Sequence, residues 1–343
     1  MRGLRELILR ELAYSKKNLW SLLGRCQFLL RDVLDELNRL YDEGLIGVDE
    51  DGLYLTEKGR SLISTESLRL KAGLCEACKG RRITLDGEFK DLLREFKSIV
   101  KGRPRPVLDY FQGYMREYDV VARVALMNYY GDLSGREIIL IGDDDLLSVA
   151  LSLTELPSRI LVLDIDERLG GFLEKINRDY GFQIEFKRHN VADPLPEDII
   201  GSFDVFSSEP LETWSGLRAF IVRGVSCLKE DGVGYFGLTR VEASLKKWRK
   251  VERLITEMNC AITDIIRDFS AYPMDYETVN YELFVKRLKF PVEKNPGIDW
   301  YKSTLFRIKV LGKPKLIVDP HKRLKISYVD KEEDVTYPAA YET

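Results

Sequence analysis

The stretch from Ile138 to Ala150, IILIGDDDLLSVA, constrains the fold of this chain more than any other part of the sequence. Four apolar residues that favour β-structure end in one glycine, three aspartates follow, and an apolar helical pattern begins at once. A buried parallel strand that turns sharply into a helix has this pattern. In open α/β sheets, ligands bind beyond the carboxyl ends of such strands. The sequence therefore predicts a ligand site at Gly142 and the residues that follow it.

The three acids of this turn, Asp143, Asp144 and Asp145, indicate which kind of ligand it suits. A strand-to-helix turn that binds phosphate leaves its amides free for the anion. Three carboxylates would repel a phosphate at the same place. We therefore expect the turn to face a cationic group.

Strand and helix patterns alternate after this turn. Further strands are predicted within residues 158–166, 183–193, 203–210, 233–239, 260–273, 278–290 and 303–311, the last three closing the sheet. Repeated βα units followed by antiparallel strands predict an α/β fold, a doubly wound, Rossmann-like sheet of the methyltransferase type. We place this domain at residues 131–326, and expect the polar tail at 327–343 to be mobile until ligand binds.

Residues 1–65 predict a separate domain, because their pattern gives three helices and a two-stranded hairpin. The third helix ends at Gly44, and a tight turn at Asp51 and Gly52 joins the two strands. This order is typical of a winged helix-turn-helix, whose recognition helix enters the major groove of DNA. Here that helix carries more acidic than basic residues, which suits phosphate poorly. We therefore favour a dimerisation or substrate-covering domain over specific DNA binding.

Cys75 and Cys78 lie in the sequence Cys-Glu-Ala-Cys-Lys-Gly, within a segment at 66–130 that is otherwise predicted to be a helical linker. A turn of this kind is half of a zinc ribbon. The other three cysteines are isolated in the sequence, and one pair cannot fill a tetrahedral site. A vestigial turn with no metal is favoured; a degenerate knuckle, a redox pair and a site shared between subunits are the alternatives.

The composition excludes several classes of protein. Hydrophobic residues make up 45% of the chain, which is enough for an ordinary packed core. No apolar run approaches the roughly 18 residues of a membrane span, and the amino terminus lacks a signal-peptide core. A net charge of −3 gives no basic field for nucleic acid. We therefore expect a cytoplasmic protein, and the scarcity of glutamine with 32% charged residues favours a thermophilic source.

Acidic residues follow three more of the predicted strands. In this fold a nucleoside lies across the strand ends, where a carboxylate can accept hydrogen bonds from two vicinal ribose hydroxyls. We expect Asp164 to bind the ribose and Asp193 to accept a hydrogen bond from the adenine amino group. Glu209 follows the strand expected at the centre of the sheet, where the reacting group of the donor would lie.

These residues also carry a family resemblance. The segment Asp164-Ile-Asp166-Glu167 is similar to the acid-Ile-Asp segment of spermidine and spermine synthases. With the GDDD turn, the Ser-Glu-Pro-Leu-Glu-Thr segment at 208–213, the helices upstream and the Cys-x-x-Cys turn, the chain resembles the branched-chain polyamine synthases of thermophilic archaea and bacteria. The resemblance extends from the first helix to about Leu311. It implies transfer of aminopropyl groups from decarboxylated S-adenosylmethionine to the central nitrogen of spermidine, giving N4-aminopropylspermidine and N4-bis(aminopropyl)spermidine plus methylthioadenosine.

The chain departs from this family at one segment. The family usually has Asp-Pro-Pro-Glu-Thr where this chain has Glu209-Pro-Leu-Glu212-Thr. The carboxylate is kept but is one methylene longer, and a rigid proline is lost. The departure concerns the reach of the carboxylate and the rate more than the reaction type.

The chemistry of the donor agrees with this resemblance. Decarboxylated S-adenosylmethionine lacks the α-carboxylate, so no negative charge balances its ammonium, and an acidic turn suits it. A carboxylate can accept the proton of the attacking amine, and the sulfonium is already a good leaving group. We therefore expect no metal and no cofactor, with the decarboxylated donor as co-substrate. The expected roles are catalysis for Asp166 and Glu209, donor binding for Gly142, Asp143, Asp164, Glu167 and Asp193, and polyamine binding for Asp144, Asp145 and Glu212.

Two alternatives stay open from the sequence. One is a methyltransferase that uses ordinary S-adenosylmethionine, since Ser208-Glu209-Pro210 loosely resembles amino-methylating motifs of the Asp-Pro-Pro-Tyr kind. The other is a winged-helix regulator whose Rossmann-like domain only senses a nucleoside or a polyamine. A homodimer or a higher homo-oligomer is expected in either case.

Overall fold

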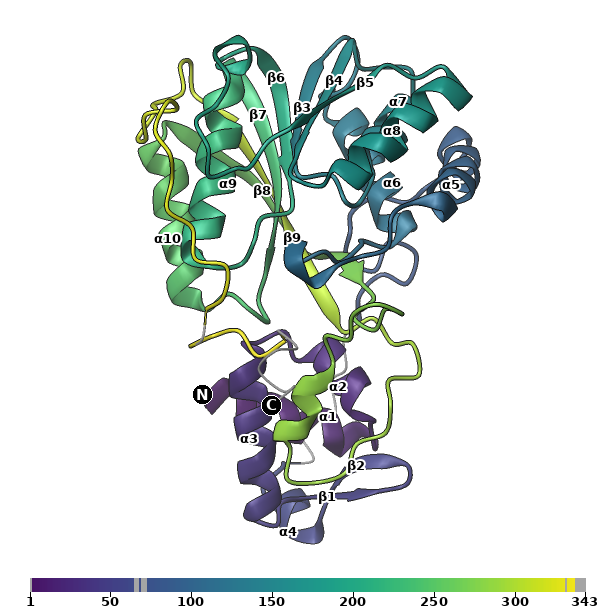
Figure 1. Ribbon diagram of the computed structural model, residues 1–343. Coiled ribbons are helices and arrows are strands. Elements are labelled where there is room, and N and C mark those ends of the chain that lie inside the picture. The colour runs from purple at the N-terminus through teal and green to yellow at the C-terminus, as the bar shows by residue number, and fades with distance from the viewer. Residues whose placement is uncertain (1, 65–67, 69–72, 331, 337–343) are drawn as a thin grey trace.

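A mixed sheet of seven strands forms the centre of the molecule, seen in a computed structural model that describes residues 2–64, 68, 73–330 and 332–336 (Figure 1). The strands lie in the order β5-β4-β3-β6-β7-β9-β8. The first five are parallel, and β9 pairs antiparallel with both β7 and β8. Their bounds are β3 Glu137–Ile141, β4 Arg159–Asp164, β5 Ile184–Arg188, β6 Phe203–Ser208, β7 Leu228–Thr239, β8 Cys260–Tyr272 and β9 Tyr301–Val310.

Helices cover both faces of this sheet. Alternate residues of β3 point to opposite faces: Ile138 packs with one set of helices and Ile139 with the other. The first face is covered by α5 Glu88–Ile99, α6 Glu117–Tyr129, α7 Leu147–Ser152 and α8 Glu167–Tyr180. The second is covered by α9 Trp214–Cys227 and α10 Leu245–Glu257. The continuous apolar run of β3 thus reflects burial on both sides, and the α/β sheet of the methyltransferase type is confirmed.

The amino-terminal residues form a smaller unit below the sheet in Figure 1. It contains helices α1 Arg2–Tyr14, α2 Leu19–Arg25 and α3 Leu30–Asp42, a hairpin of β1 Ile46–Asp49 and β2 Gly52–Leu55, and a short helix α4 Glu57–Arg60. Gly52 has a φ of 117°, and a Cβ there would lie 2.6 Å from the carbonyl oxygen of Lys17. Only glycine lets the hairpin approach the loop between α1 and α2 so closely.

Helix α3 packs against a loop of the main domain. Asn38 Nδ2 donates to the carbonyl oxygen of Arg287 over 2.9 Å, and Lys289 N donates to Asn38 Oδ1 over 2.8 Å. Lys289 also forms an ion pair with Asp42. At the start of the helix, Leu30 N donates to the carbonyl oxygen of Val241, just after β7, over 2.8 Å. One face of α3 is therefore occupied by the chain itself.

The prediction of a strand at residues 278–290 is wrong. This segment forms turns and a 3-10 helix, Leu283–Arg287, in the connection between β8 and β9. Phe284 is fully buried, edge-on to the rings of Trp20 and Trp300. The apolar residues of this segment thus pack between the amino-terminal unit and the sheet domain, and they do not form a face of the sheet. No helix among the residues that the structure describes is long and apolar enough to cross a membrane.

Candidate functional site

The turn after β3 is closed by the first of its three aspartates. Gly142 has a φ of 81°, and its amide donates to the carbonyl oxygen of Leu163 over 2.8 Å. Asp143 is buried and accepts hydrogen bonds from the amide of Ser148, at 3.2 Å, and from the Ser148 hydroxyl. Asp143, expected to bind the donor, therefore stabilises the start of α7 and lines neither of the cavities described below.

Asp164, at the end of β4, lies beside this turn. Its carboxylate accepts from the amide of Asp143 at 3.0 Å and from the amide of Asp166 at 2.8 Å. Burial raises the pKa of Asp164, and these amides act in the opposite direction. The two bonds fix the carboxylate at the strand end.

Asp164 faces a cavity at the ends of β3, β4 and β6, which we call the strand-end cavity. Its walls are mostly apolar and include several polar groups. Asp164, His189 and Asn190 supply polar groups, and burial lowers the pKa of His189, which favours the neutral imidazole. The apolar and aromatic lining includes Phe111, Ile141, Leu163, Ile165, Val191, Phe220 and Tyr328. A purine nucleoside suits such a lining, because it has a flat apolar base and a polar ribose.

Two acids expected to bind the donor lie elsewhere. Glu167 is exposed and pairs with Arg188 at 3.2 Å. Asp193 pairs with Arg323 at 3.3 Å. Neither residue lines the strand-end cavity in the described part of the chain, where His189 and Asn190 occupy the positions after β5.

Asp166 is also set back from both cavities. It caps the first turn of α8 by accepting from the amide of Arg168 at 3.0 Å. Gln112 Nε2 donates to it over 2.9 Å and Arg168 Nη2 over 2.6 Å. Burial raises the pKa of Asp166, but the bonds from Arg168 and Gln112 outweigh it and hold the pKa below its ordinary value. Asp166 thus contacts the cavity lining through Gln112, which lines both cavities.

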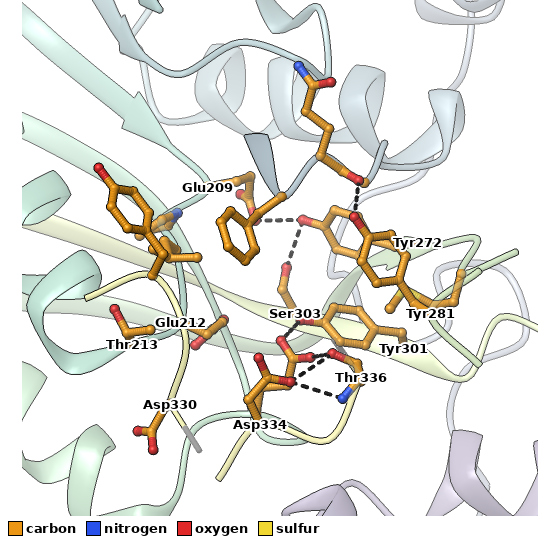
Figure 2. A pocket seen from close by; sticks show the side chains of 18 of the residues that line it. Glu209, Glu212, Thr213, Tyr272, Tyr281, Tyr301, Ser303, Asp330, Asp334 and Thr336 are labelled. Carbon is orange, nitrogen blue, oxygen red and sulfur yellow. Dashed lines mark hydrogen bonds between the residues drawn. The ribbon is translucent and has the colours of Figure 1, made fainter. Parts of the chain in front are cut away.

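A second cavity adjoins the first and extends towards the carboxyl-terminal segment; we call it the tail-side cavity (Figure 2). Glu209 and Tyr272 lie at one end of it, and Asp330, Asp334 and Thr336 lie at the other. The two cavities share Phe111, Gln112, Asp144, Glu209, Pro210, Leu211 and Tyr328.

Glu209 is held firmly at the junction of the two cavities. Tyr272 Oη donates to Glu209 Oε2 over 2.5 Å, and the buried guanidinium of Arg123 pairs with Oε1. A Cβ on Gly237 of β7 would lie 2.0 Å from Oε2, so the absence of a side chain there makes room for the carboxylate. These three residues define the position of Glu209.

The other two aspartates of the turn lie next to Glu209. Asp144 lines both cavities, and burial together with the carboxylates of Asp145, Asp164 and Asp143 raises its pKa well above the ordinary value. Asp145 is buried and accepts from the amide of Met115 at 2.5 Å. Burial and the charge of Glu209 raise the pKa of Asp145 to about 7. A cation placed here would relieve the repulsion between these acids.

Comparison with known proteins identifies the family. A family model described as the branched-chain polyamine synthase A C-terminal domain matches residues 91–335. The chain belongs to this family. It is 39% identical over 323 residues to the N(4)-bis(aminopropyl)spermidine synthase of Thermococcus kodakarensis, covering 93% of this chain and 91% of that protein. It is 41% identical over 297 residues to the protein of the same name from Methanocaldococcus jannaschii, covering 85% of this chain and 83% of that protein.

A solved structure from the branched-chain polyamine synthase family is similar over nearly the whole chain. The enzyme from Thermus thermophilus, crystallised in complex with N4-aminopropylspermidine and 5'-methylthioadenosine, matches with a TM-score of 0.83 and 33% sequence identity. The match covers 97% of this chain and 93% of that chain. Both the sheet domain and the amino-terminal unit are therefore part of the similarity.

Several residues of the site could not be found from the strand-end pattern. Arg123 lies on α6, Tyr272 ends the antiparallel strand β8, and Gln112 lies in the loop before α6. The sequence offers one indication of Arg123, because it is the single charged residue in the apolar run VVARVALM. A charge in such a helix is rarely buried without a partner, and Glu209 is that partner.

The Cys75 and Cys78 pair lies apart from both cavities. Amides of Cys78 and Ala77 donate to the Cys75 sulfur and lower the pKa of its thiol. Among the described residues, no group of three or more histidine, cysteine or acidic side chains is arranged to hold a metal ion. Whether this turn is vestigial or shared between subunits stays a prediction.

Proposed function

We propose that this chain transfers aminopropyl groups from decarboxylated S-adenosylmethionine to the central secondary amine of spermidine. The products are N4-aminopropylspermidine, then N4-bis(aminopropyl)spermidine, with methylthioadenosine released at each step. The observation that carries this proposal is that a cavity suited to a nucleoside and an acidic cavity meet at Glu209 and Asp144. The family of the chain supports the same reaction.

The donor fits the strand-end cavity. Asp164 would accept hydrogen bonds from the ribose hydroxyls, and the adenine would lie among the apolar side chains. The sulfonium and the aminopropyl group would then extend to the junction, next to Asp144. Ordinary S-adenosylmethionine would bring its α-carboxylate to the same acids, so the acidic turn favours the decarboxylated donor over a methyl donor.

Glu209 is our choice for the group that receives the proton. The amine nitrogen attacks the carbon next to the sulfonium, the new C–N bond forms, and the C–S bond breaks to release methylthioadenosine. The acceptor nitrogen attacks only in its unprotonated form, so Glu209 accepts one proton from the ammonium form, directly or through a water molecule. In the second transfer the tertiary nitrogen becomes a quaternary ammonium, so this proton leaves before the C–N bond forms. Each oxygen of Glu209 bonds Arg123 or Tyr272 on one side and keeps a further acceptor direction. The step requires no cofactor, and the decarboxylated donor is a co-substrate.

We assign a positioning role to Asp166, which the sequence pointed to as a second catalytic acid. Its carboxylate holds Gln112, and Gln112 lines both cavities at their junction. Asp166 would therefore act on the reaction through the placement of Gln112. Asp144 and Asp145 keep their expected role next to the substrate ammoniums, with Asp144 in direct contact.

We also propose that the amino-terminal unit is a winged helix-turn-helix used as a covering domain. The order of three helices and a hairpin supports the fold, and the packing of α3 on the loop at 287–290 supports the role. The domain bounds at 65, 130 and 326, the cytoplasmic location and the homo-oligomer stay predictions.

Replacement of Glu209 by glutamine tests the proposal. The change keeps the size of the side chain and removes the base, so turnover with spermidine should fall by about 10²-fold or more while donor binding changes little. Mass analysis of the polyamines after incubation with each donor measures turnover, and a binding titration with the donor measures its affinity. Glu252→Gln, on the exposed side of α10, is a matched control. Near-normal turnover of Glu209→Gln, or methylation of spermidine from the ordinary donor by the unchanged enzyme, would refute the proposal.

A further inference from the structure

Two carboxylates line the tail-side cavity beyond its junction with the strand-end cavity. Glu212 belongs to the loop after β6, and Glu242 belongs to the loop after β7. Neither residue lines the strand-end cavity. They therefore face the part of the tail-side cavity that lies away from the donor.

Glu212 has one oxygen with no partner. Oε1 accepts a hydrogen bond from the amide of Thr239 over 2.8 Å. Oε2 is buried and accepts no hydrogen bond from any residue that the structure describes. An unsatisfied buried oxygen is costly, and native proteins seldom leave one without a reason such as a ligand. Burial raises the pKa of Glu212 well above its ordinary value.

Glu242 lies in a similar environment. Tyr301 Oη donates to its Oε2 over 2.6 Å, and the Thr336 hydroxyl donates to its Oε1. Burial and the nearby charge of Asp334 raise its pKa to about 7. Both donors are neutral groups, so they satisfy hydrogen bonds of Glu242 without balancing its charge.

The lysine next to these carboxylates is already engaged. Lys247 Nζ pairs with Asp330 at 2.8 Å and with Glu333 at 3.1 Å. It also donates to the backbone carbonyl oxygens of Glu212 and Glu242, at 3.0 and 3.2 Å. Its short contacts therefore leave the two side-chain carboxylates without an ion pair among the described residues.

The walls between the junction and this end suit an aliphatic chain that ends in a cation. Tyr272 and Tyr301 stand opposite Glu212 in Figure 2. Tyrosine faces attract ammonium groups and also pack against methylenes. A linear aminoalkyl arm that starts at Glu209 would pass these rings before it reaches the two carboxylates.

We propose that Glu212 and Glu242 form a distal ammonium site, which binds one terminal amine of the acceptor. The proposal rests on the proposed function and adds to it the reason for the choice of nitrogen. With one terminal ammonium fixed, the length of the arm decides which nitrogen reaches Glu209. A linear polyamine with an internal secondary amine would then react at that internal nitrogen.

Blocking each terminal amine of the substrate tests the site without changing the enzyme. Acetylation removes the charge of one arm, so N1-acetylspermidine and N8-acetylspermidine each lose a different terminal ammonium. We expect the KM of one of the two to exceed that of spermidine by about 10-fold or more, since one partner of a desolvated charge pair is lost. Equal and unchanged KM values for both compounds would overturn the proposal.

The variants Glu212→Gln and Glu242→Gln show whether this discrimination comes from the distal site. Each should raise the KM for spermidine by about 10-fold or more, leave the KM for the donor unchanged, and reduce the preference between the two acetylated compounds. Thermal unfolding checks that each variant is folded, and Glu252→Gln on the exposed side of α10 controls for loss of one negative charge. Variants that keep the full preference of the unchanged enzyme would overturn the assignment to these residues.

The two failures are distinguishable. If the unchanged enzyme forms no aminopropylated spermidine at all, the proposed function is wrong. If it does, and the acetylated compounds and the variants behave like spermidine and the unchanged enzyme, only the distal ammonium site is wrong.

Discussion

A methyl group at position 237 should impair the site although no charged residue is substituted. Gly237 lies on β7 behind Glu209, and a Cβ there would be 2.0 Å from Oε2 and 2.6 Å from Cδ of that side chain. The carboxylate oxygen would have to retreat by about 1.4 Å to reach the 3.4 Å of an ordinary contact. The retreat breaks the bond from Tyr272 and displaces the ion pair with Arg123.

This displacement gives the magnitude of the effect. A misplacement of about 1 Å in a group that handles the reacting atoms costs about 10²-fold in rate. We therefore expect Gly237→Ala to lower kcat with spermidine by about 10²-fold. Over-packing of the methyl group would lower the free energy of unfolding by about 1–3 kcal/mol, so activity is measured well below the unfolding temperature.

The assay compares four proteins: the unchanged enzyme, Gly237→Ala, Glu209→Asp and the double variant. Aspartate at 209 withdraws the carboxylate by one methylene and vacates the space that the new methyl group needs. The alanine should therefore cost much less activity in the aspartate background than in the glutamate background. Gly171→Ala, on the exposed side of α8 where a Cβ meets nothing within 4 Å, is the control. Equal costs in the two backgrounds, or no loss in Gly237→Ala, would refute the steric argument.

Three further predictions concern other parts of the chain. Asp144→Asn should raise the KM for spermidine more than it lowers kcat, because Asp144 lines both cavities and receives a substrate ammonium; steady-state kinetics would show the reverse if it were a base. Replacement of Cys75 and Cys78 by serine should leave kcat unchanged in a folded protein, because neither residue lines either cavity; loss of turnover would show that the pair takes part in catalysis. The unit at 1–65 should not bind duplex DNA specifically, since α3 is acidic and packed on its own chain; anisotropy titration at physiological salt measures this, and sequence-dependent binding lost on deletion of the unit would disprove it.

The part of the site that lies at the ends of the parallel strands could be predicted from the sequence, because each of its residues directly follows a strand. The residues after β3, β4 and β6 meet at one edge of the sheet whenever the strands are parallel and adjacent, as they are here. Gly142, Asp164 and Glu209 thus lie near one another, as the order of strands and acids predicted.

The rest of the site depends on contacts that are distant in sequence. Asp193 follows a strand like the other acids, yet the chain turns so that it pairs with Arg323 in the carboxyl-terminal segment. Tyr272 meets Glu209 only because β8 returns antiparallel at the far edge of the sheet. The alternation at 278–290 resembled a strand because Phe284 has to be buried, and one of its partners, Trp20, lies near the amino terminus, far from it in sequence. Local sequence patterns cannot predict such contacts between distant residues.

The bond between Leu30 and Val241 links the amino-terminal helices to the segment that carries Glu242. The amino-terminal unit thus contacts the residue directly before Glu242, which lines the distal part of the tail-side cavity. Under the role proposed for Glu242, a shift of α3 on the main domain would move the carboxylate of this residue and change the length of acceptor that fits. Substitutions in α3, whose residues line neither cavity, are therefore expected to alter the range of acceptors, and a search for variants that accept longer or shorter chains should include residues 30 to 42.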